Sequence, residues 1–163
     1  MSIRTYGDPV LRRSAQTVET IDSETKKLCQ RMVEEMIRGG GVGLAAPQIG
    51  VSRRIIVLDV DGAFHVLINP ELIDRSDETE LFTEGCLSVP GVHADVKRSH
   101  SATVAGTNLE GERVEITGEG FLARAIQHEM DHLDGRLFLD HLSPVRRQGV
   151  LKDYERKGRE ETG

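Results

Sequence analysis

Residues 127–132 read Gln127-His128-Glu129-Met130-Asp131-His132, and the rest of the fold is best understood by working outward from this stretch. On a helix, His128 and His132 lie four positions apart, so both imidazoles project from one face and can bind a single metal ion. Glu129 lies near the open side of such an ion, where a general base is useful. Two histidines on a helix can equally form a hydrogen-bonded buried pair or a surface pair, so the motif alone leaves the metal hypothesis open.

The residues around this motif predict a buried helix. Gly120 and Gly135 mark its expected ends. The apolar positions on either side of the histidines are Phe121, Leu122, Ala125, Ile126, Met130, Leu133, Leu137 and Phe138. A second helix is predicted from Asp22 or Ser23 to about Arg38, where three consecutive glycines end it. A polar third helix over residues 144–158 opens with Ser143-Pro144, an N-cap followed by proline.

The remaining chain predicts antiparallel strands. Residues 54–59 form a buried strand, Asp61-Gly62 is a hairpin turn, and residues 63–68 return until Asn69-Pro70 ends the strand. Shorter strands are expected at residues 72–73, 80–83, 92–96, 101–105 and 113–117, and Pro9-Val10-Leu11 is expected to be an extended arm. The predicted fold class is α+β, with antiparallel β-sheets packed around a central helix that bears the H-E-x-x-H motif, an N-terminal helix and a C-terminal helix.

Length and charge restrict the class of protein. The 163 residues predict a single domain over residues 1–163, and the net charge of −6 argues against broad binding to DNA or anionic membranes. No apolar run reaches the roughly 20 residues of a membrane span, and the start of the chain lacks the apolar core of a signal peptide. Cys29 and Cys86 do not make a disulfide framework, so we expect a cytoplasmic protein in which Cys29 is a core side chain.

Two further stretches place polar residues among glycines. Residues 39–50, GGGVGLAAPQIG, lack the ending of a phosphate loop, and their small side chains instead let another backbone approach. Gln48 is the one polar side chain between Gly43 and Gly50, and this segment alone favours a surface position for it. In EGCLSVP (84–90), Cys86 is either a packed thiol or a third metal ligand, and the stretch alone does not decide between them.

Together, GVGLAAPQIG (41–50), EGCLSVP (84–90) and QHEMDHLDG (127–135) resemble the three signature motifs of peptide deformylases, in the family's order and with similar separations. IRTYGDPVLR near the start and RLFLDHLSP after the third motif extend the resemblance over nearly the whole chain. The resemblance implies a hydrolase that removes the formyl group from the N-terminal formyl-methionine of newly synthesised proteins and releases formate. It also implies that Cys86, His128 and His132 bind one divalent metal ion, with water in the fourth position.

The resemblance implies the other roles as well. Glu129 would be the general base and then the general acid, while the Gln48 amide and the Leu87 backbone N–H would hold the oxyanion. The Val42-Gly43 backbone would pair with the substrate peptide as an added strand. The residues expected to line the methionine pocket are Val42, Phe82, Phe121 and His128. Fe²⁺ is the expected ion, Zn²⁺, Ni²⁺ or Co²⁺ can take its place, and a thiolate on ferrous iron predicts oxygen-sensitive activity.

Two features bear on partners. Many family members carry an arginine three residues after the proline of EGCLSVP, and His93 stands there in this chain, which puts in doubt a fixed positive charge toward the substrate backbone. The tail has net charge +2, from six basic residues (Arg146, Arg147, Lys152, Arg156, Lys157 and Arg159) and four acidic ones (Asp153, Glu155, Glu160 and Glu161). The resemblance suggests that this helix contacts the ribosome, and a solvated amphipathic helix is the alternative. We expect a monomer with no DNA or membrane partner.

Two other functions share the H-E-x-x-H motif. A zinc endopeptidase would usually take its third ligand downstream, but His141 does not have the G-x-x-H spacing of such enzymes, and Cys86 is the apparent ligand instead. A non-catalytic, metal-stabilised relative would have a fourth protein ligand or would have lost Glu129. The chain retains Glu129 and offers no obvious fourth ligand, which favours the deformylase.

Overall fold

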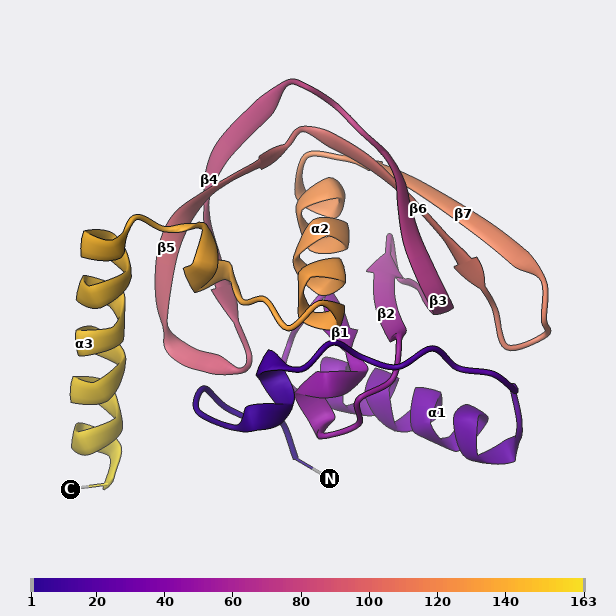
Figure 1. Cartoon of the computed structure of the whole chain (residues 1–163), viewed down its shortest axis with the longest axis horizontal. Helices are drawn as coiled ribbons and strands as arrows, with labels where there is room; N and C mark the ends of the chain where they lie inside the picture. The colour runs from indigo at the N-terminus through magenta and orange to yellow at the C-terminus, as the bar shows by residue number, and fades with distance from the viewer. Residues whose placement is uncertain (1, 163) are drawn as a thin grey trace.

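The computed structural model describes residues 2–162, which form two antiparallel sheets, three α-helices and three short 3₁₀ helices (Figure 1). In chain order the elements are η1 (Pro9–Arg12), α1 (Ser23–Arg38), β1 (Gly43–Ala45), η2 (Ala46–Ile49), β2 (Ile55–Val60), β3 (Ala63–Arg75), β4 (Thr79–Cys86), β5 (Val89–Ser99), β6 (Ser101–Thr107), β7 (Arg113–Glu119), α2 (Phe121–Leu133), η3 (Phe138–His141) and α3 (Pro144–Thr162). The predicted α+β class is confirmed. Within residues 2–162, no helix has both the length and the apolar character needed to cross a bilayer.

The helix that carries the H-E-x-x-H motif, α2, touches both sheets. The larger sheet has the strand order β1-β2-β3-β6-β7, and β4 and β5 form a separate hairpin. Figure 1 shows α2 between this hairpin and the larger sheet, and it packs against β1, β2, β6 and β7 as well as β5. Residues 123–130 of α2 are all buried. A motif on this helix can therefore meet side chains from both sheets.

The ends of the helices follow local sequence rules. The Asp22 side chain accepts a hydrogen bond from the Thr25 N–H and caps α1, as its position predicts. Cys29 is fully buried on the inner face of α1, and burial raises the pKa of its thiol to about 11, so it is a core side chain as expected. After α2, Gly135 has φ +73°, and a Cβ there would lie 2.6 Å from the Arg12 carbonyl oxygen. Only glycine fits this junction between α2 and the N-terminal segment.

The prediction that Asn69-Pro70 ends a strand is wrong. β3 continues to Arg75, so residues 72–73 belong to its second half. The pairing of β3 with β6 shifts register twice, between Ile68 and Glu71 and between Leu72 and Asp74. Asn69 has φ +51°, and its side chain bonds both the N–H and the C=O of Val18. This long-range contact holds an irregularity in the strand where the local sequence indicates only a break.

The N-terminal segment is also not the extended arm that was predicted. Pro9–Arg12 forms η1, in which the Asp8 side chain accepts a hydrogen bond from the Val10 N–H. Val10 and Leu11 are buried. An Asp-Pro start is a good helix opening, and burial of two apolar side chains stabilises the turn that follows.

Candidate functional site

Cys86, His128 and His132 come together where the β4–β5 hairpin meets α2. Cys86 Sγ lies 3.4 Å from His132 Nε2, and the two histidine Nε2 atoms are 3.2 Å apart. The three ligand atoms all lie within 4.8 Å of one another. Bonds of about 2.0–2.3 Å to one tetrahedral ion place ligand atoms at comparable separations. The trio can therefore bind a single ion without rearrangement.

The chemistry of the trio fits a divalent cation. His128 Nδ1 lies 2.6 Å from Glu84 Oε1, so Nδ1–H donates to the carboxylate and Nε2 presents its lone pair to the other two ligands. Burial raises the pKa of the Cys86 thiol, but the neighbouring His132 and His128 outweigh it and hold that pKa well below its usual value. Thiolate is the form that binds metals. A cation shared by the three atoms satisfies all of them at once.

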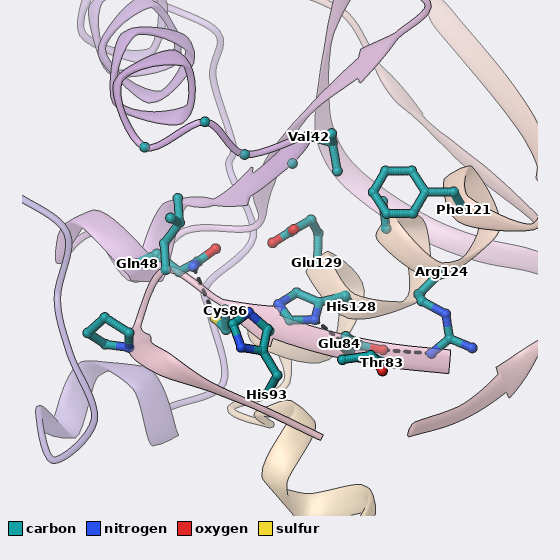
Figure 2. A pocket seen from close by; sticks show the side chains of 18 of the residues that line it. Val42, Gln48, Thr83, Glu84, Cys86, His93, Phe121, Arg124, His128 and Glu129 are labelled. Atoms are coloured by element: carbon teal, nitrogen blue, oxygen red, sulfur yellow. Dashed lines mark hydrogen bonds and ion pairs between the residues drawn. The ribbon is translucent and has the colours of Figure 1, made fainter. Parts of the chain in front are cut away.

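A cavity of about 510 Å³ opens beside the trio (Figure 2). Of the residues singled out from the sequence, Val42, Gly43, Gln48, Cys86, Leu87, His93, Phe121, His128 and Glu129 line it. Phe82 is not among the lining residues; its ring lies over the guanidinium of Arg124, 5.6 Å away, and Arg124 does line the cavity. His141, considered above as a downstream ligand, instead places its Nε2 2.7 Å from Asp131 Oδ2.

Gln48 is buried and points toward the trio, contrary to the surface position that its own segment favoured. Its Oε1 accepts a hydrogen bond from the Ala45 N–H at 2.9 Å. Its Nε2 then faces the site, 3.3 Å from Ser88 Oγ and 3.6 Å from Cys86 Sγ. Because the backbone of β1 takes the amide oxygen, the amide N–H₂ is the group offered to anything bound near Cys86.

Glu129 has the properties of a general base. It is buried, and among the described residues its Oε1 has no hydrogen-bond partner. Burial is the main cause of a raised pKa for this carboxyl group. A Cβ on Gly43 would lie 2.7 Å from Glu129 Oε2 and 2.9 Å from Cγ, so the carboxylate occupies the space a side chain would fill. A buried carboxylate with a free oxygen beside a metal site is suited to receive a proton from water.

The open edge of β1 borders the same cavity. β1 is the edge strand of its sheet, and the Val42 carbonyl accepts a hydrogen bond from the Asp59 N–H of β2. Alternation along a strand then directs the N–H and C=O of Gly43 away from β2. An extended peptide could pair with these groups and reach the trio.

Three charged residues behind the trio were missed by sequence reasoning. The Glu84 carboxylate accepts hydrogen bonds from His128, Arg98 and Arg124. These partners offset the free-energy cost of burying its negative charge. Burial alone would raise the pKa of Glu84, but the bonds from His128 and Arg98 hold it far below its usual value. Glu84 stands in the stretch EGCLSVP, where its closeness to Cys86 was a usable signal. Arg98 and Arg124 lie in no motif, and no local pattern marks them.

Comparisons with known proteins agree with this geometry. Residues 1–148 match the family model described as polypeptide deformylase. A peptide deformylase of Natranaerobius thermophilus is 48% identical over 147 residues, which is 90% of this chain and 94% of the relative. The crystal structure of a Legionella pneumophila peptide deformylase superposes with a TM-score of 0.94 at 41% identity, covering 99% of this chain and 96% of the other. A Synechococcus elongatus peptide deformylase in complex with actinonin has a TM-score of 0.90 at 38% identity, covering 95% and 86%.

The geometry of Cys86, His128 and His132 predicts how mutations change metal binding. Cys86→Ala and His132→Ala each remove one candidate ligand atom. Loss of a residue that only supports a ligand costs roughly 10–100-fold in metal affinity, so we expect the Zn²⁺ affinity of these variants to fall by more than that. Competition with a chromophoric chelator measures this affinity. Cys29→Ala is the matched control, because that cysteine is buried in the core away from the trio. Unchanged affinity in Cys86→Ala would contradict the assignment.

Proposed function

Because this chain belongs to the peptide deformylase family, we propose which of its residues carry out the family's reaction. The chain is a metal-dependent hydrolase that removes the formyl group from the N-terminal formyl-methionine of nascent proteins. The observation that carries the proposal is the unpartnered Glu129 carboxylate beside Cys86, His128 and His132, at the wall of an open cavity.

Cys86, His128 and His132 are assigned as the protein ligands of one divalent ion. Such an ion supplies Lewis acidity, which lowers the pKa of a coordinated water and polarises the formyl carbonyl. Three protein ligands beside a cavity are the pattern of a catalytic site rather than a structural one. Thiolate and imidazole suit Fe²⁺, Zn²⁺, Ni²⁺ and Co²⁺. Fe²⁺ is proposed as the native ion on the strength of the family resemblance.

The chain's own groups handle the proton and the developing charge. Glu129 accepts a proton from the attacking water and delivers it to the departing amine nitrogen, which releases formate and a free N-terminal methionine. The Gln48 Nε2–H and the Leu87 backbone N–H donate to the formyl oxygen, which becomes negatively charged when water attacks the formyl carbon. The bond from Ala45 to the Gln48 oxygen supports this role, because it orients the amide before substrate arrives.

The substrate peptide is proposed to add to the open edge of β1. Gly43 offers its N–H and C=O there, and the methionine side chain enters the cavity between Val42, Phe121 and His128. Phe82 stays a predicted residue of this pocket: it does not line the cavity itself, and its ring lies over Arg124, which does. His93 also lines the cavity, and its ring packs against Gly85: a Cβ added to Gly85 would lie 2.5 Å from His93 Cδ2.

The reaction and the role of Glu129 are tested together by formate release from a formyl-methionyl peptide. We expect anaerobically prepared, Fe²⁺-loaded protein to release formate rapidly, and Glu129→Gln to lose about 10²–10⁴-fold in kcat because acid–base catalysis is removed. Air exposure should inactivate the iron form but not a Zn²⁺ form. Equal kcat in Glu129→Gln would refute its role. Cleavage of internal peptide bonds, without formate, would indicate an endopeptidase.

Position 43 is expected to tolerate only glycine, because the Glu129 carboxylate occupies the space that a Cβ would take. Gly43→Ala keeps the backbone groups that pair with a peptide, so KM should change little. Its methyl group displaces the Glu129 carboxylate, and a shift near 1 Å can cost about 100-fold in rate. Steady-state kinetics separate the two parameters. Gly149→Ala is the control, because a Cβ there meets nothing within 4 Å. A Gly43→Ala enzyme with unchanged kcat would refute this packing argument.

The proposed ribosome contact through α3 would use basic residues, several of which also attach this helix to the rest of the fold. Arg146 and Lys157 donate to backbone carbonyls of β5, and Arg147 donates to carbonyls of η3 and the residues beside it. Arg156 pairs with Asp153, and the side chain of Arg159 lies outside the described residues. Arg146 and Lys157 are nonetheless exposed, and so are Lys152 and Arg156. Charge reversal at Lys152 and Arg156, which leaves the bonds to β5 and η3 intact, should reduce co-sedimentation with ribosomes, and an unchanged amount would favour a solvated helix.

The chain is further proposed to act as one catalytic domain over residues 1–163 and as a cytoplasmic monomer. The proposed metal ligands come from both the hairpin and α2, which supports one domain. The net charge of −6 supports a monomer, because copies of the chain repel one another. A mass well above 18.0 kDa in light scattering would contradict the monomer.

A further inference from the structure

Arg98 on β5 is one of the most buried charges in the described structure, although it lies outside all three motif stretches. Its side chain is 3% exposed. The guanidinium bonds two carboxylates at once. Nε and Nη2 donate to the two oxygens of Glu84 at 2.9 and 2.6 Å, and Nη1 donates to Asp131 Oδ2 at 2.7 Å.

The two carboxylates relate differently to the metal trio: Glu84 bonds His128 directly, whereas Asp131 is the sequence neighbour of His132, whose Nδ1 has no hydrogen-bond partner among the described residues. Glu84 Oε1, which receives the Arg98 Nη2–H, is the same atom that accepts from His128 Nδ1 at 2.6 Å. Asp131 precedes His132 in the last turns of α2. Arg98 therefore links Glu84, which bonds His128, to Asp131, which precedes His132. In doing so it connects β4, β5 and α2.

Arg124 does not duplicate this connection. It donates to the other oxygen, Glu84 Oε2 (Figure 2). It also donates to the backbone carbonyls of Val96 and Glu80. Among the described residues it bonds neither Glu84 Oε1 nor Asp131, and one face of its guanidinium lies under the Phe82 ring. If Arg98 were absent, Arg124 would hold one carboxylate oxygen, and the oxygen that orients His128 would have the histidine as its only partner.

We propose that Arg98 is a positioning residue for the metal centre, which fixes the Glu84 carboxylate against His128 and the end of α2 beside His132, so that both imidazoles face the ion. This rests on the metal-ligand set proposed above. Only arginine can perform the task, because its planar fork presents donors to two carboxylates in fixed directions. Lysine keeps the charge but has a single nitrogen, which cannot reach both sides of the bridge.

The test compares Co²⁺-loaded Arg98→Lys with the unmodified protein. Loss of an outer partner of a metal ligand costs about 10–100-fold in affinity, so Arg98→Lys should release Co²⁺ to a chelator about 10–100-fold faster. Its Co²⁺–thiolate absorption should also change, since the imidazoles no longer hold their directions. Arg113→Lys is the matched control, because Arg113 pairs with Glu115 on the exposed face of β7. Wild-type release and an unchanged spectrum in Arg98→Lys would overturn the proposal.

Folding and function are separated by two further measurements. Thermal unfolding of metal-free Arg98→Lys shows whether it folds. If it does not, Asp131→Asn keeps Arg98 but weakens one of its two bridges, and it must also speed metal release if the proposal holds. Unmodified protein that binds Co²⁺ but releases no formate would refute the proposed function and leave the role of Arg98 standing.

Discussion

The hydrogen bond between His128 Nδ1 and Glu84 Oε1 is the contact on which the rest of this site depends. It selects the tautomer of His128 and so directs the Nε2 lone pair toward Cys86 and His132. A buried carboxylate is costly unless it is paired and hydrogen-bonded. The two arginines that meet this requirement come from β5 and from α2, so the hairpin must pack closely against the helix. The same packing brings Cys86, at the end of β4, to the histidines.

A second constraint is the absence of a side chain at Gly43. The Glu129 carboxylate, the proposed general base, occupies that space, and the backbone of Gly43 lies on the open edge of β1. One glycine thus places the proposed substrate-binding edge and the proposed proton acceptor next to each other. Ala45, two residues later, uses its N–H to orient Gln48. The short strand β1 therefore organises one wall of the cavity, and α2 and the hairpin organise the others.

The basic residues of the C-terminal helix have a packing role that a charge count does not reveal. Its basic residues suggest a surface for an anionic partner, but several of them donate to backbone carbonyls of the body and so fasten the helix to β5 and η3. Val150, Leu151 and Tyr154 pack into the same apolar cluster as Cys86. These bonds to neutral carbonyls do not remove the positive charge, and Arg146 and Lys157 stay exposed, so the same residues hold the helix in place and present charge to a partner.

The sequence by itself determined the features that depend on a few neighbouring residues. These are the spacing of His128 and His132, the Asp22 cap of α1 and the Asp61-Gly62 turn, in which both residues have positive φ. Family resemblance named Cys86 and Gln48, because three motifs together are specific where one is not. Only the tertiary structure decided that β3 passes through Asn69-Pro70, that Gly43 makes room for Glu129, and that Arg98 bridges Glu84 and Asp131. The physical reason is range: caps, turns and helical spacing act between adjacent residues, whereas a buried ion pair joins residues far apart in the chain and leaves no local pattern.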